Sequence, residues 1–281
     1  MPPRCGLAKR PRDNLTTMAV VPRSTIDSKG TTISYLDFGG VGQLIVLLHG
    51  LAGRASEWTD TAIALTGRGH VVAPDLRGHG HSDRLPRDVS PEAHTTDVVK
   101  LIQHLHGGPI KLIGQSFGGL VAYLVAATHP ALVKGLVVVE AGVSKPRDEE
   151  RSRTINWLRS WPVPFESRET AEGFFKGRGN YGRTWASLLE PRVDGLWPAF
   201  NVDVMERTLA AIPDYGWQWA RLQCRTLVVA GADSSSDKAE LAEMADKVGG
   251  EYEAIPDADH DVHLEAPEQW MNLLKAFLDG L

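Results

Sequence analysis

One serine of the chain stands where an apolar run of residues meets a run with helical periodicity. It is Ser116, in the tract GQSFG at residues 114–118, and the helical run that it opens stops before Pro130. The spacing G-x-S-x-G between a strand and a helix holds a serine on a sharp turn, because the glycines let the two backbones approach closely. The free N–H groups of the helix N-terminus favour negative charge on an attacked carbonyl oxygen. The motif therefore predicts that Ser116 is a nucleophile for acyl transfer.

A serine hydroxyl needs a neighbouring base, because it is a poor nucleophile at its own pKa. His260 lies in the loop between the last predicted strand, at 251–256, and the last predicted helix, at 268–281. In a doubly wound sheet this loop lies at the carboxyl edge of the strands, as Ser116 does. His263 follows three residues later, so the chain offers two candidates for the base.

The base needs a carboxylate in turn, which holds its tautomer and stabilises the imidazolium. With the order serine, acid, histidine along the chain, two residues qualify. Glu140 directly follows the apolar run LVVV, where burying a carboxylate is costly unless it has a partner such as His260. Asp233 follows another apolar run, at 225–231. We favour Glu140 as the acid and keep Asp233 as the alternative.

These motifs together resemble the α/β-hydrolase superfamily, in its serine esterase and lactonase branch with an inserted cap, over residues 24–281. The tract HGL at 49–51 is similar to the family's oxyanion turn. This resemblance implies that the backbone N–H groups of Leu51 and Phe117 bind the oxyanion. The tract DLRGHGHS at 75–82 is similar to the family's D-x-R-G-x-G-x-S loop.

The loop that contains His260 also resembles the family. The tract ADH at 258–260, followed by HLEAP at 263–267, is similar to the family's catalytic-histidine loop. One residue departs from the pattern, because Asp259 stands where the family usually has glycine. The match implies that His260 is the base and that His263 packs against or caps the terminal helix.

The acid is the point where the sequence departs most from the family. The family most often carries an aspartate three residues after the glycine that ends the strand at 225–231, and this chain has Ser234 there. Some lipases and lactonases of the superfamily instead carry the acid after the strand next to the nucleophile strand. That position is occupied here by Glu140.

Buried strands alternate with amphipathic helices along the chain, as in a parallel sheet covered on both faces. The expected strands are 31–38, 44–50, 70–75, 109–114, 133–142, 225–231 and 251–256. The expected helices are 58–66, 91–106, 116–129, 238–250 and 268–281. The predicted fold class is α/β, and the resemblance implies an α/β-hydrolase fold whose mostly parallel eight-stranded sheet is flanked by helices and carries a helical cap.

The alternation is interrupted between about residues 144 and 220, which hold twelve of the chain's twenty aromatic residues. We therefore expect three parts: a disordered tail at 1–20, a core domain formed by 21–143 and 221–281, and a helical, aromatic-rich cap at 144–220. A cap over the nucleophile makes a concave, apolar site for a small hydrophobic molecule. The expected pocket residues are Trp58, Trp157 and Trp161.

Hydrolysis of a small hydrophobic ester or lactone, through an acyl-enzyme on Ser116, is the simplest reaction for this set of residues. The resemblance leaves two alternatives open: carbon-carbon bond hydrolysis of a diketone with the same serine and histidine, and a ligand-sensing receptor with negligible turnover. We expect no cofactor and no metal. Two pairs of histidines could suggest a metal site, His79 with His81 and His260 with His263. Both pairs lack the spacing or the cysteines of a metal-binding motif.

The composition favours a small molecule, rather than nucleic acid or a membrane, as the binding partner. A net charge of −5 does not favour nucleic acid, and no apolar run reaches the length that spans a bilayer. Two cysteines, Cys5 and Cys224, imply no disulfide framework, so we expect a cytoplasmic protein. The tract 1–17 has no continuous apolar core and is not a secretory signal, and Met18 is an alternative start. The sequence leaves the oligomeric state undetermined.

Overall fold

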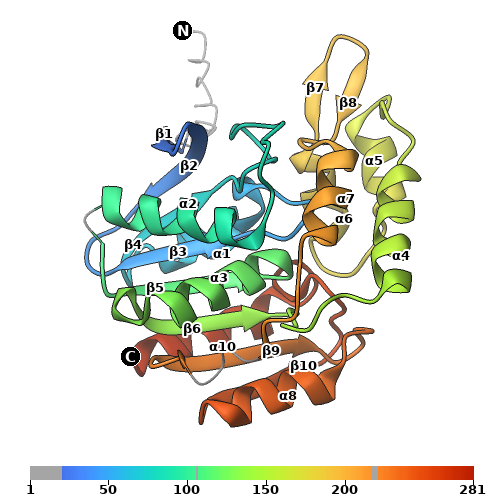
Figure 1. Ribbon diagram of the computed structural model, residues 1–281. Helices are drawn as coiled ribbons and strands as arrows, with labels where there is room; N and C mark the ends of the chain where they lie inside the picture. The colour runs from blue at the N-terminus through green and yellow to red at the C-terminus, as the bar shows by residue number, and fades with distance from the viewer. Residues whose placement is uncertain (1–20, 106, 217–220) are drawn as a thin grey trace, which may run out of the picture.

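An eight-stranded sheet runs through the centre of the structure (Figure 1). The computed structural model describes residues 21–105, 107–216 and 221–281, so the tail predicted for 1–20 lies outside the described residues. The strands lie in the order β1-β2-β4-β3-β5-β6-β9-β10; the pairs β1–β2 and β2–β4 are antiparallel and all others are parallel. The bounds are β1 (Arg23–Ser28), β2 (Thr31–Gly39), β3 (Leu44–Leu48), β4 (His70–Pro74), β5 (Ile110–Gln115), β6 (Val133–Val139), β9 (Arg225–Gly231) and β10 (Glu251–Ile255). The predicted fold class is confirmed.

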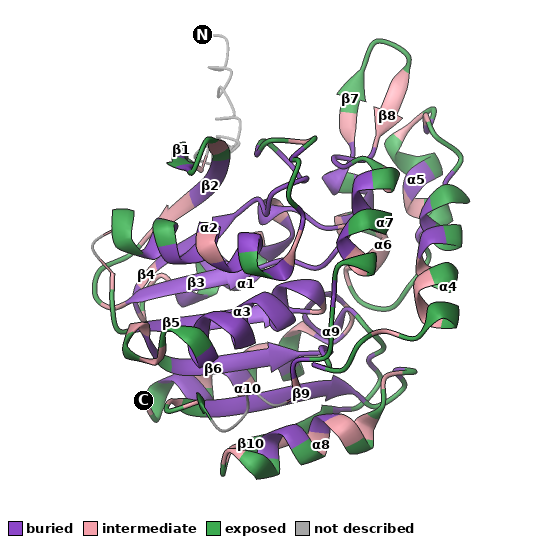
Figure 2. Cartoon of the chain, in the orientation of Figure 1, coloured by how far each residue is buried: buried purple, intermediate pink, exposed green. Residues whose placement is uncertain are grey.

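Helices cover both faces of the sheet. The core helices are α1 (Thr59–Leu65), α2 (Pro91–His104), α3 (Phe117–Thr128), α8 (Lys238–Lys247), α9 (Val262–Glu265) and α10 (Pro267–Asp279), with short 3-10 helices η1 (Ala55–Trp58) and η2 (Pro130–Leu132). In β3, Leu44, Val46 and Leu48 pack with the residues of α2 and α3, whereas Ile45 and Leu47 pack with those of α1 and α10. Successive side chains of a strand point to opposite faces, so a strand covered on both faces is buried throughout, as β3 is in Figure 2, and its residues are apolar on both sides.

One strand, β1, is not predicted by the sequence. It is an edge strand that pairs only with β2, and only its Ile26 and Ser28 are buried. An edge strand that is mostly exposed carries little apolar signal, which is why the sequence pattern misses it. The helix expected at 58–66 also differs, because it divides into η1 and α1.

The segment between β6 and β9 lies beside the carboxyl ends of the strands (Figure 1). It forms α4 (Asp148–Arg159), α5 (Arg168–Phe174), α6 (Tyr181–Leu188) and α7 (Val202–Ala210), together with the hairpin of β7 (Glu190–Arg192) and β8 (Gly195–Trp197). The sequence predicts helices here and not the hairpin, although Asp194-Gly195 is a common hairpin signal. The cap boundaries at 144 and 220 stay a prediction, and residues 217–220 lie outside the described part of the chain. We refer to residues 148–210 as the upper segment.

The strand register brings two site residues to the same edge of the sheet. Gln115 at the end of β5 pairs with Val139 at the end of β6. The next residues are Ser116 and Glu140, whose backbone N–H groups donate to the carbonyl oxygens of Val139 and Val229, each at 2.8 Å. Serine and carboxylate therefore leave the sheet side by side. Among the described helices, none is both long and apolar enough to cross a membrane.

Candidate active site

Ser116 lies on a strained turn between β5 and α3. Its φ of 50° and ψ of −123° fall in a region that side-chain-bearing residues rarely adopt. A Cβ atom on Gly114 would lie 2.2 Å from the carbonyl oxygen of Gly118, and one on Gly118 would lie 2.4 Å from that of His49. Both glycines are therefore required for the turn, as the G-x-S-x-G spacing predicts.

The close contact between Gly118 and the backbone of His49 predicts that a larger residue at position 118 destabilises the fold. We expect Gly118→Ala to lower the free energy of unfolding by about 3 kcal/mol, because the new methyl group meets backbone atoms that cannot move independently. The matched control is Gly173→Ala on the exposed face of α5, where a Cβ atom meets nothing within 4 Å. This control should be neutral or stabilising by up to about 1 kcal/mol. Urea denaturation of both variants measures the difference, and equal stabilities would contradict the steric argument.

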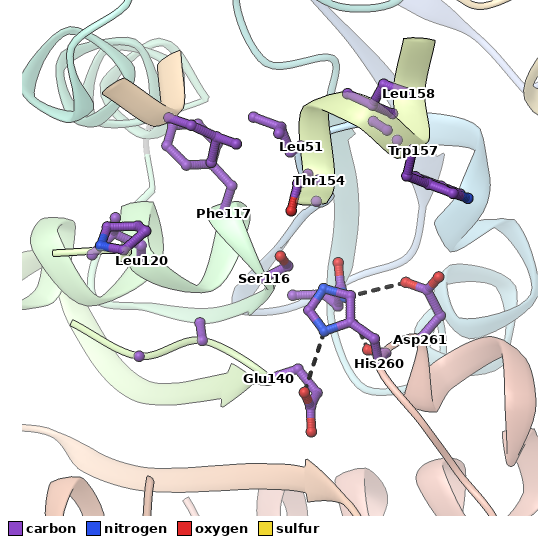
Figure 3. Close-up of a pocket in the computed structure, with 18 of the residues that line it drawn as sticks. Leu51, Ser116, Phe117, Leu120, Glu140, Thr154, Trp157, Leu158, His260 and Asp261 are labelled. Carbon is purple, nitrogen blue, oxygen red and sulfur yellow. Dashed lines mark hydrogen bonds and ion pairs between the residues drawn. The ribbon is translucent and has the colours of Figure 1, made fainter. Parts of the chain in front are cut away.

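His260 and Glu140 are in contact. His260 Nδ1 lies 3.2 Å from Glu140 Oε2, and Figure 3 shows the imidazole between the hydroxyl of Ser116 and this carboxylate. A proton on Nδ1 leaves Nε2 free to act as a base toward Ser116. Glu140 itself has a φ of 52°, a positive value that residues with a side chain rarely adopt.

The carboxylate of Glu140 is fully buried and fully hydrogen-bonded. Oε1 accepts from the N–H of Gly231 at 2.7 Å, and Oε2 accepts from Ser234 Oγ at 2.6 Å and from Ser236 Oγ. Burial by itself raises the pKa of a carboxyl, but the hydrogen bonds from His260 and Ser234 outweigh it and hold the pKa of Glu140 below its usual value. Ser234, at the position where the family most often has its acid, is here a donor to the acid.

Asp233, the alternative acid, lies elsewhere. Its side chain is 47% exposed and forms an ion pair with Arg178. Its backbone N–H donates to the carbonyl oxygen of Ala258 at 2.9 Å. The structure thus brings Glu140, and not Asp233, to His260.

His260 carries its proton more strongly than an ordinary histidine. Half of its side chain is open, and it lines the cavity in front of Ser116. Burial of the remainder lowers the pKa, but the hydrogen bond with Glu140 and the charge of Asp261 outweigh burial and raise the pKa of His260 to about 9. The free base of His260 therefore forms at higher pH than that of an ordinary histidine.

A cavity of about 450 Å³ opens at Ser116 (Figure 3). Its apolar wall consists of Leu51, Phe117, Leu120, Leu158, Leu209 and Ile212. Its polar side includes Glu57, Gln115, Tyr181, Trp185 and Asp261, and the guanidinium of Arg153 also lines it. The cavity is thus large enough for a small molecule and mixed in polarity.

One of the three tryptophans expected in the pocket lines the cavity, and two do not. Trp157 of α4 is on the cavity wall. Trp58 is completely buried and stacked on His263, with ring centroids 4.2 Å apart. Trp161 is buried within the upper segment, where its ring packs edge-to-face on Phe175 at 4.7 Å. Trp58 and Trp161 lie away from the cavity because their large rings fill the core that supports it.

The predicted oxyanion turn lies against the cavity, and buried histidines contact its backbone. Leu51 and Phe117 both line the cavity, and Phe117 is the first residue of α3, so its N–H has no acceptor within the helix. His79 is fully buried, and its Nε2 contacts the carbonyl oxygen of Leu51. His49 Nε2 accepts from the N–H of Leu76 at 2.9 Å. These contacts hold the backbone of the turn in place.

Two carboxyl groups of the cavity escape the sequence analysis. Glu57 is buried, and burial raises its pKa to about 8; its Oε1 lies 3.5 Å from His263 Nε2. Burial lowers the pKa of His263 to about 4, so both groups of this pair are neutral at pH 7. Asp261 is also buried and lines the cavity. Its place directly after His260 is the one signal that marks it in the sequence, whereas nothing in the pattern marks Glu57.

The two histidine pairs for which the sequence favours no metal role are not part of a larger ligand cluster in the described residues. Within residues 21–105, 107–216 and 221–281, no group of three or more histidine, cysteine, aspartate or glutamate side chains is placed to hold a metal ion. His81 Nδ1 lies 3.6 Å from Asp75 Oδ2, while His79 points to Leu51.

The chain is similar to known hydrolases. The model of the family described as "Alpha/beta hydrolase family" matches residues 45–272. The (E)-2-((N-methylformamido)methylene)succinate hydrolase of Acinetobacter baylyi is 29% identical over 260 residues, which cover 90% of this chain and 96% of that protein. The sn-1-specific diacylglycerol lipase of Mus musculus is 28% identical over 271 residues, covering 90% of this chain and 87% of that protein. The solved structure of E-2-(acetamidomethylene)succinate hydrolase superimposes with a TM-score of 0.84 at 23% identity, covering 92% of this chain and 100% of that one.

Proposed function

Because the chain belongs to the alpha/beta hydrolase family, we propose that it hydrolyses a small, largely hydrophobic ester or lactone through an acyl-enzyme on Ser116. The observation that carries the proposal is the contact of His260 with the buried carboxylate of Glu140, at the cavity that Ser116 also lines. This arrangement matches the roles of nucleophile, base and acid in acyl transfer. The family relationship makes the chain an enzyme of the hydrolase type.

The reaction begins when Ser116 Oγ attacks the substrate carbonyl carbon while His260 Nε2 takes the hydroxyl proton. The backbone N–H groups of Leu51 and Phe117 bind the resulting oxyanion. When the intermediate collapses, the leaving alcohol receives the proton from His260. Water then gives a proton to His260 and attacks the acyl carbon. As the bond from that carbon to Ser116 Oγ breaks, His260 returns the proton to Oγ, which releases the acid and restores the serine. Throughout, Glu140 holds the Nδ1–H of the imidazole.

The charge of the cavity supports a neutral substrate. Asp261 is a buried carboxylate on its wall, Glu57 is neutral at pH 7 because burial raises its pKa to about 8, and Arg153 is on the exposed side of α4. The relatives compared above include hydrolases named for succinate derivatives, which carry two carboxylates. A buried negative charge repels such a substrate, and an exposed guanidinium compensates little of this because water screens it.

This argument makes a prediction about substrate charge. We expect kcat/KM for p-nitrophenyl butyrate to exceed that for mono-p-nitrophenyl succinate by at least tenfold, or about 1.4 kcal/mol, at neutral pH. The two esters share a leaving group and differ mainly in one carboxylate. Preference for the succinate ester, lost on Arg153→Gln, would show instead that Arg153 binds an anion and that the substrate is acidic.

The nature of the reaction is tested with an active-site probe and a substrate panel. A fluorophosphonate should label the purified protein at Ser116, identified by peptide mass spectrometry. Short p-nitrophenyl esters and lactones are then compared with a vinylogous diketone, since a carbon-carbon hydrolase prefers the diketone. Labelling without turnover of any member, together with tight ligand binding, would favour the ligand-sensing receptor. Failure to label Ser116 would overturn the proposal.

The cytoplasmic location that the sequence predicts is also part of the proposal. Cys224 carries a free thiol, and burial raises its pKa, which keeps it in the unreactive protonated form. A free thiol fits a reducing compartment. Cell fractionation with an antibody to the protein tests this location.

A further inference from the structure

Asp261 lies where three parts of the site meet (Figure 3). Its Oδ1 accepts a hydrogen bond of 3.1 Å from Nε2 of Gln115, the last residue of β5. Its Oδ2 accepts one of 3.1 Å from Nε1 of Trp185 in α6. The amide of Gln115 also donates to the carbonyl oxygen of His260 at 3.0 Å. Asp261 therefore joins the histidine loop to the nucleophile strand and to the upper segment.

The histidine loop touches the upper segment at a second point. The backbone N–H of Asn180, just before α6, donates to the carbonyl oxygen of Leu264 in α9 at 2.8 Å. A Cβ atom on Gly179 would lie 2.5 Å from the same carbonyl oxygen, so the two backbones are in close contact. The residues just before α6 are therefore in direct backbone contact with α9, which follows the loop that carries His260.

Asp261 is buried without a strong cation beside it. The residue is 6% exposed, and the basic groups that act on its carboxyl are the imidazoles of His260 and His263, of which His263 is neutral at pH 7. Burial, the largest influence, raises the pKa of Asp261, and these imidazoles oppose it. A buried carboxylate interacts strongly with a nearby imidazolium, because little water separates the charges.

Besides Glu140, four titratable groups face His260: Asp259 and Asp261 from its own loop, Glu57 from η1 and His263 from α9. Glu57 and His263 are neutral at pH 7, because burial raises the pKa of the first to about 8 and lowers that of the second to about 4. Asp259 is exposed, so water screens its charge. Both carboxyl oxygens of Asp261 accept hydrogen bonds, as those of a carboxylate do, so Asp261 is the one buried negative charge in this set.

We propose that Asp261 is a positioning residue that orients His260 and stabilises its imidazolium, and that Trp185 couples this action to the upper segment. The inference rests on the proposed function, in which His260 is the base. The imidazolium forms as Ser116 attacks, so a second carboxylate beside it stabilises the tetrahedral intermediate. The same charge sets the pH above which the free base exists.

The first test removes the charge. The rate of labelling of Ser116 by a fluorophosphonate is measured against pH for the wild type, Asp261→Asn and the matched control Asp259→Asn. We expect the midpoint of the rise for Asp261→Asn to move to lower pH by roughly 1 pH unit, and that of the control to move much less because Asp259 is exposed. NMR titration of His260 in histidine-labelled protein, assigned with His260→Asn, should show the same displacement. Asp261→Ser repeats both measurements if Asp261→Asn does not fold.

The second test removes the link to the upper segment. Trp185→Phe keeps an aromatic ring and the charge of Asp261, but lacks the N–H donor. We expect its KM for p-nitrophenyl butyrate to rise with the pH midpoint unchanged. The double variant with Asp261→Asn should lose less kcat/KM than the product of the two single losses, because both changes break one connection. Independent, multiplying losses would overturn the coupling.

The two proposals fail in different ways. If the wild type is not labelled at all, the proposed function fails, and the NMR titration still measures the effect of Asp261 on His260. If the wild type is labelled and the Asp261 variants keep both its midpoint and its rate, the inference about Asp261 is overturned while the proposed function stands.

Discussion

Ser116→Ala is expected to lower kcat for ester hydrolysis by about a million-fold, while the affinity for substrate or product changes little. The hydroxyl of Ser116 forms the covalent bond in the proposed reaction, and no other hydroxyl occupies the turn between β5 and α3. The new methyl group fits, because the serine Cβ atom already occupies that space. The backbone strain at φ 50° is also unchanged, since alanine and serine have the same Cβ constraint. Stopped assays with p-nitrophenyl butyrate and a binding titration with its acid product measure the two effects.

The matched control for this prediction is Ser187→Ala. Ser187 is exposed in α6, where its hydroxyl donates to the carbonyl oxygen of Thr184 at 2.7 Å. We expect its kcat to match that of the wild type. If Ser116→Ala kept substantial activity in a preparation shown to be free of other esterases, Ser116 would not be the nucleophile.

Glu140→Gln is expected to lower kcat by about ten-thousand-fold. An amide is almost isosteric with the carboxylate, but it cannot stabilise the imidazolium and can present an N–H group to His260 Nδ1. The histidine is then held in the wrong tautomer for catalysis. The donors of Gly231 and Ser234, which lie 2.7 Å and 2.6 Å from the carboxylate oxygens, also lose a charged acceptor. Steady-state kinetics and thermal unfolding separate the loss of rate from any loss of fold.

Asp233→Asn is the matched control, because it changes the other candidate acid in the same way. Asp233 is half exposed and paired with Arg178, so we expect activity near the wild-type level. The opposite result, with a large loss only in the Asp233 variant, would transfer the role of acid from Glu140 to Asp233. A large loss in neither variant would remove the carboxylate from the mechanism.

Much of the core fold follows from local sequence. The apolar runs that become β3, β5, β6 and β9 are buried on both faces, and such runs rarely occur elsewhere in a polypeptide that folds in water. The turn at Ser116 is equally local, because a strand, two glycines and a helix determine its backbone within a few residues. The edge strand β1 escapes the pattern because most of its residues are not buried, and the hairpin of β7 and β8 escapes it because each strand has three residues and none of them is buried.

The sequence by itself determined the fold class and the turn that holds Ser116, and it narrowed the base and the acid to a few residues. Only the tertiary structure shows which of these residues are in contact. Strand register brings Glu140 to His260 and leaves Asp233 at the surface, and register depends on hydrogen bonds between segments that are far apart in the chain. Core packing decided that Trp58 supports the site and that Trp157 lines it, since both rings are equally apolar. The tertiary structure also decides the charges around His260. Burial of the neighbouring groups sets their pKa values, and no local sequence pattern encodes that burial.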